Sequence, residues 1–179
     1  MPKDISPLRM IVAIIVLFGV VVITQVLFPA IEAGQTDPSL RAVTFGDYHS
    51  FRDGNLSTQA ATALAESGIS ADEVYDGWVV YRNEGCVQCH TQQVRAIVTD
   101  VGLGAVVGAA DISLTDFDLT GHERLGPDLS SVGSRLDQRK LAEVVTDASA
   151  RHRWTTMPSY DYLSDQEIDD LVAYLSTLR

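Results

Sequence analysis

The chain has 179 residues, enough for one ordinary domain and an additional element. Its 24 acidic residues outnumber its 13 basic ones, and the resulting net charge of -11 argues against a nucleic-acid partner. Two cysteines in a chain of this length exclude a disulfide-stabilised scaffold. The acidic surface is consistent with a basic partner or simply with solubility.

The first expected element is a membrane-spanning helix over residues 10–28. This run carries no charged residue. At about 1.5 Å per residue it spans roughly 28 Å, close to the bilayer's hydrocarbon thickness of about 30 Å. Lys3 and Arg9 precede it, so the positive-inside rule places residues 1–9 in the cytoplasm and the rest of the chain outside. Pro29 predicts the end of this helix.

A cleaved signal peptide is the alternative for this segment. The apolar run is longer than the usual signal-peptide core of about 7–15 residues. Ile31 also stands where a cleavage site before residue 34 needs a small residue. We therefore expect an uncleaved anchor in the lipid bilayer.

Residues 29–69 are expected to form an extracytoplasmic spacer. From Glu32 onward the segment is rich in Ala, Ser, Thr, Gly and Asp, which favours solvated loop. Residues 57–67 predict one short helix within it, ended by Gly68.

From Ser70 the pattern predicts a compact helical domain over residues 70–179. Ser70 and Glu73 form a capping box that starts a helix of about three turns. One face of this helix carries mostly large side chains: Val74, Tyr75, Trp78, Tyr81 and Arg82. The helix leads directly to the cysteines.

A second capping box, Ser164 and Glu167, predicts the final helix. Apolar residues recur along it at helical spacing: Ile168, Leu171, Val172, Leu175 and Leu178. Acidic residues are expected on its outer, solvated face: Asp165, Glu167, Asp169 and Asp170. Because strand patterns are few, we expect an all-α fold.

Both cysteines lie in one short motif, GCVQCHT, at residues 85–91. A structural zinc site needs four ligands, and the chain has no second cysteine pair. A thioredoxin-like pair belongs at a strand-to-helix junction, whereas this pair follows a predicted helix. Covalent haem attachment uses all three side chains, with Cys86 and Cys89 as thioethers and His90 as the proximal iron ligand. We expect one covalent haem c, with the redox pair and the zinc site as alternatives.

Met157, in the stretch WTTMPSY, is the expected sixth ligand of the iron. Met1 is the start and Met10 opens the membrane helix, so Met157 is the remaining methionine. A thioether ligand raises the reduction potential toward electron-transfer values. His152 and His122 are rival ligands, and core packing is the alternative role for a lone methionine.

The stretch LGPDL at residues 125–129 supplies a partner for His90. A metal-bound histidine usually donates its second ring N–H to an oxygen, and the Pro127 carbonyl is our candidate acceptor. A plain Gly-Pro turn is the alternative interpretation. Three apolar residues are expected to cover the rim of the haem: Leu129, Val132 and Leu136.

The order of helix, CxxCH, Gly-Pro segment, methionine loop and closing helix resembles a class I cytochrome c. YRNEGCVQCHTQQVR, at residues 81–95, more specifically resembles the membrane-anchored mono-haem cytochrome c subunit of the cbb-type haem–copper oxidases. It has a tyrosine five residues before the first cysteine, Glu-Gly directly before it, and Gln92 and Arg95 after the histidine. RLGPDLSSVGSR at residues 124–135 and MPSY at residues 157–160 resemble later motifs of that subunit.

The resemblance implies a haem c bound by Cys86 and Cys89, with His90 and Met157 as axial ligands. Gln92 and Arg95 would contact a propionate or the catalytic partner, with ordinary surface polarity as the alternative. Arg124 and Arg135 are further candidates for pairing with propionates.

The resemblance also implies an electron-transfer subunit rather than a catalytic one. It would be a single-pass protein of the bacterial cytoplasmic membrane, with its haem domain on the periplasmic side. It would accept electrons from a donor cytochrome or a quinol-oxidising complex. It would then pass them singly to the membrane catalytic subunit of a cytochrome c oxidase-like complex.

Three departures from that family keep other functions open. The segment between Gly133 and Met157 is shorter than expected. The spacer over residues 32–69 is longer than expected, and residues 96–121 are rich in Gly, Ala and Val and predict a hairpin or a docking surface. One alternative is the cytochrome subunit of a nitric oxide reductase or another respiratory or photosynthetic complex. The others are a membrane-tethered shuttle, and a haem gas sensor or peroxidase with an open sixth position.

Overall fold

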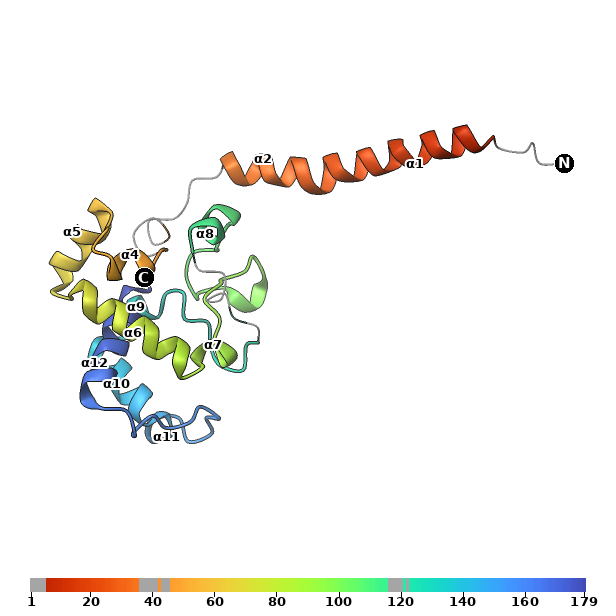
Figure 1. The fold of residues 1–179 in the computed structure, drawn as a ribbon. Helices are drawn as coiled ribbons and strands as arrows, with labels where there is room; N and C mark the ends of the chain where they lie inside the picture. Colours follow the sequence, from red (N-terminus) through yellow and green to blue (C-terminus); the bar gives the residue numbers. More distant parts are fainter. Residues whose placement is uncertain (1–5, 36–41, 43–45, 116–120, 122) are drawn as a thin grey trace. The chain divides into compact units, whose positions relative to one another are not determined.

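The computed structural model describes residues 6–35, 42, 46–115, 121 and 123–179, and these residues contain helices and no strand (Figure 1). The predicted all-α class is therefore confirmed. The chain divides into two compact units, Met1–Asp37 and Pro38–Arg179.

The N-terminal unit is a long apolar helix made of α1 (Pro7–Val22), a π-helical turn η1 (Ile23–Leu27) and α2 (Phe28–Gln35). From Pro7 to Glu32 it is long and apolar enough to cross a membrane. The predicted stop at Pro29 is wrong, because the helix continues to Gln35. Pro29 stands at the second position of α2, where a missing N–H is tolerated. The carbonyl that this N–H would have reached, that of Gln25, lies in the widened π turn.

The segment before Ser70 packs against the domain, in contrast to the solvated spacer expected there. It holds α4 (His49–Arg52) and α5 (Thr58–Ser67), and the predicted helix at residues 57–67 is confirmed, with Ser57 as its N-cap and Gly68 at its end. Five of its described side chains join the hydrophobic core: Tyr48, Phe51, Ala60, Leu64 and Ile69.

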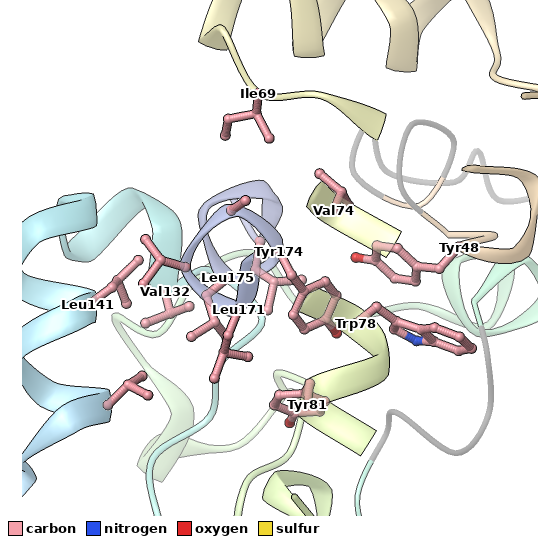
Figure 2. Close-up of a cluster of buried hydrophobic side chains, with 14 of the residues drawn as sticks. Tyr48, Ile69, Val74, Trp78, Tyr81, Val132, Leu141, Leu171, Tyr174 and Leu175 are labelled. Carbon is pink, nitrogen blue, oxygen red and sulfur yellow. The ribbon is translucent and has the colours of Figure 1, made fainter. Parts of the chain in front are cut away.

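Two long helices, α6 (Ala71–Asn83) and α12 (Asp165–Thr177), form the centre of the domain. Both begin at the predicted capping boxes. Aromatic rings fill the space beside them, with the Tyr174 ring centroid 5.0 Å from that of Tyr48 and 5.3 Å from that of Tyr81 (Figure 2). The predicted apolar faces of both helices thus meet in one core.

The two helices cross at Gly77, where a Cβ would collide with the backbone of Asp170. Only glycine permits this approach, so the helices touch backbone to backbone. The close crossing buries Asp170, which we expected on a solvated face, and desolvation raises the pKa of its carboxyl group. The other three acidic residues, Asp165, Glu167 and Asp169, are exposed as expected, so the acidic outer face lacks only Asp170.

Shorter helices complete the domain: α7 (Cys86–Cys89), η2 (Val98–Asp100), α8 (Ala109–Leu114), α9 (Val132–Arg135), α10 (Gln138–Thr146) and α11 (Ala148–Arg151). α9 and α10 pack against α12, and α6 leads directly into α7 (Figure 1). The described part of residues 96–121 forms η2 and α8 rather than the hairpin we considered.

Candidate functional site

A cavity of about 750 Å³ opens beside α7, and both cysteines, His90 and Met157 line it. Apolar side chains supply much of the remaining wall, among them Leu129, Val132, Leu136, Leu141, Val145 and Leu171. The volume and the mainly apolar lining are those of a site for a cofactor-sized ligand. The three predicted rim residues, Leu129, Val132 and Leu136, all lie on this wall.

The two cysteines sit on one short turn of helix, because α7 spans only Cys86 to Cys89. Residues three apart share a helical face, so both side chains reach the cavity. Burial raises the pKa of the Cys86 thiol to about 11. A redox-active CxxC pair works through a lowered thiol pKa, so this environment argues against the thioredoxin-like alternative.

The zinc alternative also lacks support. Among the residues that the structure describes, no group of three or more His, Cys, Asp or Glu side chains is placed to hold a metal ion. His122, one of the distant histidines that a zinc site would need, lies outside the described residues.

His90 is buried and its ring is held by one backbone group. Its Nδ1 lies 2.8 Å from the Pro127 carbonyl oxygen, so the predicted contact is confirmed. Burial lowers the pKa of the imidazole. A neutral ring that donates from Nδ1 keeps the lone pair of Nε2 for a metal.

Gly126 completes the seat of this ring. A Cβ at position 126 would collide with the imidazole of His90. Two backbone bonds fix the segment alongside: Gly126 N–H donates to the Cys89 carbonyl and Leu129 N–H donates to the Thr91 carbonyl, both at 2.8 Å. The Gly-Pro pair therefore sets both the space for the ring and its hydrogen bond.

Met157 approaches the cavity from the loop between α11 and α12. Its side chain is half-buried and packs against the hydrophobic core, and its N–H donates to Thr155 Oγ1 at 3.1 Å. His152 also lines the cavity, but its side chain is exposed. Burial favours Met157 over His152 as the group that faces a bound ligand.

Residues 70–178 match the protein family described as "Cytochrome C oxidase, mono-heme subunit/FixO". The chain belongs to this family. The match begins at the N-cap of α6 and ends just after α12, so it contains every residue that lines the cavity. No curated protein matches the chain.

The cavity of this mono-haem cytochrome c oxidase subunit fits the one haem that the family implies. Its wall is largely apolar, and it brings two thiols, an imidazole and a thioether to one space. The ring of His90 already has its second nitrogen engaged, as iron-bound histidines require. The residues that would hold the group are therefore in place.

The arginines of the subunit are arranged differently from our expectation. Arg135 lines the cavity, whereas Arg95 and Arg124 are not among its described lining residues. Arg95 donates from Nε to Asp100 at 3.1 Å, and Arg124 donates to both Asp100 and Asp128. A propionate contact of Arg95 stays a prediction, and Arg135 is the better-placed candidate.

Gln92 is not a surface residue of the subunit. It is 3 % exposed, and its Nε2 donates to the Tyr174 hydroxyl at 2.7 Å. The amide thus ties the segment after His90 to α12, and a direct contact with a partner subunit is excluded by this burial.

Our sequence reasoning missed two buried carboxylates, Asp100 and Asp128, which are 2 % and 0 % exposed. Hydrogen bonds from Arg95 and Arg124 lower the pKa of Asp100 well below its usual range. The signal for Asp128 was present in the sequence, because it stands between Pro127 and Leu129 in a segment already assigned to the site.

Proposed function

We propose that the chain binds one haem c covalently and passes single electrons to the catalytic subunit of a cbb-type haem–copper oxidase. Cys86 and Cys89 would hold the haem through thioethers, and His90 and Met157 would be its axial ligands. When bound, haem supplies one-electron redox chemistry. The observation that carries the proposal is that one apolar cavity is lined by all four of these side chains.

The polypeptide holds and shields the redox centre. The apolar wall excludes water, and the Pro127 carbonyl fixes the direction of the His90 ring. Met157, which lines the same cavity, would occupy the sixth position of the iron and would favour electron transfer over the binding of small ligands. This arrangement supports a carrier rather than a gas sensor or a peroxidase.

For the membrane topology we infer an uncleaved anchor at residues 10–28, with residues 1–9 in the cytoplasm. The apolar helix from Pro7 to Glu32 supports the anchor. Lys3 and Arg9 at its start support this orientation in a bacterial cytoplasmic membrane. The cytochrome c domain, residues 70–179 together with the segment before Ser70 that packs into its core, would then face the periplasm.

The electron donor would be a donor cytochrome or a quinol-oxidising complex. The net charge of -11 supports a donor with a basic docking face, because opposite charges speed the encounter of electron-transfer partners.

Gentle detergent extraction of native membranes tests the subunit assignment. The chain would be followed by in-gel haem staining, and its companions identified by mass spectrometry. We expect a large haem-staining band that contains a polytopic catalytic subunit of the haem–copper type. Haem that migrates with this chain alone would replace the subunit assignment with a membrane-tethered shuttle.

Covalent attachment is tested on denaturing gels. The wild-type chain should keep its haem stain after denaturation, whereas the double variant C86S/C89S should lose it. The matched control is Ser130→Ala, a buried residue of similar size that does not line the cavity. A stain that survives in the double variant would contradict thioether attachment.

A further inference from the structure

Asp128 is a fully buried carboxylate next to the His90 pair, and haem attachment by itself gives it no role. It follows Pro127, whose carbonyl receives the ring N–H of His90. Its side chain accepts four hydrogen bonds: from Thr91 Oγ1 at 2.7 Å, Gln93 N at 2.9 Å, Ser130 N at 2.8 Å and Arg124 Nη2 at 3.2 Å. A buried carboxylate that accepts this many hydrogen bonds is fixed in position.

The carboxylate joins the two segments that meet at the histidine. Thr91 and Gln93 follow His90 directly along the chain, while Asp128 itself follows Pro127. The bonds from Thr91 and Gln93 therefore fix the histidine segment relative to the carbonyl that the ring must reach. Loss of Asp128 would free that carbonyl to move relative to the ring.

Arg124 supplies the opposite charge to the same cluster. Its Nε donates to Thr91 Oγ1 at 2.8 Å, and its Nη2 donates to the Gln93 carbonyl at 2.7 Å. Its Nη1 lies 2.5 Å from Asp100, which in turn pairs with Arg95. The cluster thus holds two carboxylates and two guanidinium groups, so its net charge is zero.

We propose that Asp128 and Arg124 are positioning residues that set the reduction potential of the haem through the His90–Pro127 hydrogen bond and through their opposite charges. The inference rests on the proposed function, because it takes His90 as an iron ligand. A negative charge beside the ligand stabilises the more positive, oxidised iron, and a positive charge opposes this effect. A firm bond from Nδ1–H to a carbonyl makes the imidazole a stronger electron donor to the iron. This bond therefore lowers the reduction potential, as the charge of Asp128 does.

The two residues should therefore move the potential in opposite directions. D128N removes the negative charge and loosens the carbonyl, so the potential should rise. R124Q leaves Asp128 without its counter-charge, so the potential should fall. We expect the ratio of reduced to oxidised protein at fixed ambient potential to change roughly ten-fold in each case, which is about 59 mV for a one-electron couple.

The experiment is an equilibrium redox titration of the full-length, haem-loaded chain in detergent at neutral pH. D100N is the matched control, because Asp100 bonds both arginines of the same cluster but neither Thr91 nor Gln93. D100N should change the ratio less than about two-fold, and R124K should recover most of the shift seen in R124Q. Equal shifts in D100N and D128N would overturn the role of the His90–Pro127 bond, because any lost negative charge would then have the same effect. Shifts of one sign in D128N and R124Q would overturn the opposed roles of the two residues.

Thr91→Val keeps the proposal testable if D128N does not fold. Valine preserves the shape and removes one of the bonds that fix the histidine segment to Asp128, so the potential should rise, as in D128N but by less. Unchanged potentials in both T91V and R124Q would overturn the inference. A wild-type chain without covalent haem would instead overturn the proposed function, and haem staining would show this before any titration.

Discussion

His90 and Met157 line one cavity, but the fold holds their segments to different degrees. The His90 side has the Pro127 bond, the two flanking backbone bonds and the buried carboxylate of Asp128. The Met157 side is a loop whose neighbours Trp154 and Pro158 are exposed, Trp154 at 96 %. Side-chain bonds such as Ser159 Oγ to the Thr146 carbonyl, at 2.7 Å, hold it to the domain.

The difference indicates how the site is assembled and where it opens. The seat of the histidine is built from the polypeptide's own contacts, so its geometry does not depend on the cofactor. The methionine loop has fewer buried contacts and more solvent-exposed backbone, which are features of locally less stable segments. Met157, the proposed distal ligand, is therefore the one expected to detach first.

Gly126→Ala should displace the ring of His90 and have the largest effect of the variants. The new Cβ would collide with the His90 ring, which must tilt away from the Pro127 carbonyl. We expect a loss of about 1–3 kcal/mol of unfolding free energy from overpacking. The absorption spectrum should also show a disturbed proximal ligand.

Denaturant titration and absorption spectra of the haem-loaded chain measure both effects. The control is Gly108→Ala, where the nearest atom to a new Cβ is 3.9 Å away. A G126A chain with wild-type spectrum and stability would show that the ring has more room than the structure allows.

Met157→Ala should remove the proposed sixth ligand, with a smaller effect on folding stability than Gly126→Ala. The haem should stay attached, the potential should fall because the thioether is lost, and the reduced protein should bind carbon monoxide. His152→Ala is the matched variant on the same loop and should leave the spectrum unchanged. If H152A rather than M157A opens the iron, the sixth ligand is His152.

The sequence predicted which side chains share the cavity better than it predicted the contacts that hold them in place. Cys86, His90 and Pro127 were assigned correctly to one cavity because their roles depend on local spacing and on a motif. The pairing of Arg124 with Asp100 was not predictable, since the two residues lie 24 positions apart and their contact depends on tertiary structure. Gln92 was misplaced for the same reason, because its partner Tyr174 is 82 residues away.

The fold follows the same division. Capping boxes and apolar periodicity located α6 and α12, since those signals are local. Asp170 is buried because Gly77 lets α12 approach the backbone of α6. The sequence alone does not show which helix packs against Gly77. The packing of Tyr48 and Phe51 was not predicted, because these two aromatic residues lie in a segment whose other residues are mostly small or polar. Both side chains are nevertheless buried in the core.

Low pH should destabilise the charged cluster beside His90 by protonating Asp100. Hydrogen bonds from Arg95 and Arg124 lower the pKa of this carboxyl in the folded chain. The stabilisation is therefore complete above the unfolded pKa of about 3.9 and is lost as the pH falls through that value toward the lower folded pKa. Unfolding free energies measured from about pH 6 to pH 3 should fall less steeply in D100N. Parallel curves for D100N and wild type would show that the bonds of Asp100 to the two arginines do not determine the loss of stability in acid.

Tyr162→Phe should have the smallest effect, because it removes one hydrogen bond that restrains the methionine loop. The Tyr162 hydroxyl donates to the Glu84 carboxylate and so joins the methionine loop to the residue two places before Cys86, and the same contact raises the pKa of the phenol to about 12. Because Tyr162 is 66 % exposed, loss of its hydroxyl should lower the unfolding free energy only slightly. Carbon monoxide should nevertheless bind the reduced variant faster than wild type, since the tie restrains the loop that carries the distal ligand. Tyr75→Phe, which alters a tyrosine outside the cavity lining, is the control. Equal binding rates in all three proteins would mean that the tie is too weak to restrain the loop and that the core contacts of Met157 alone limit its detachment.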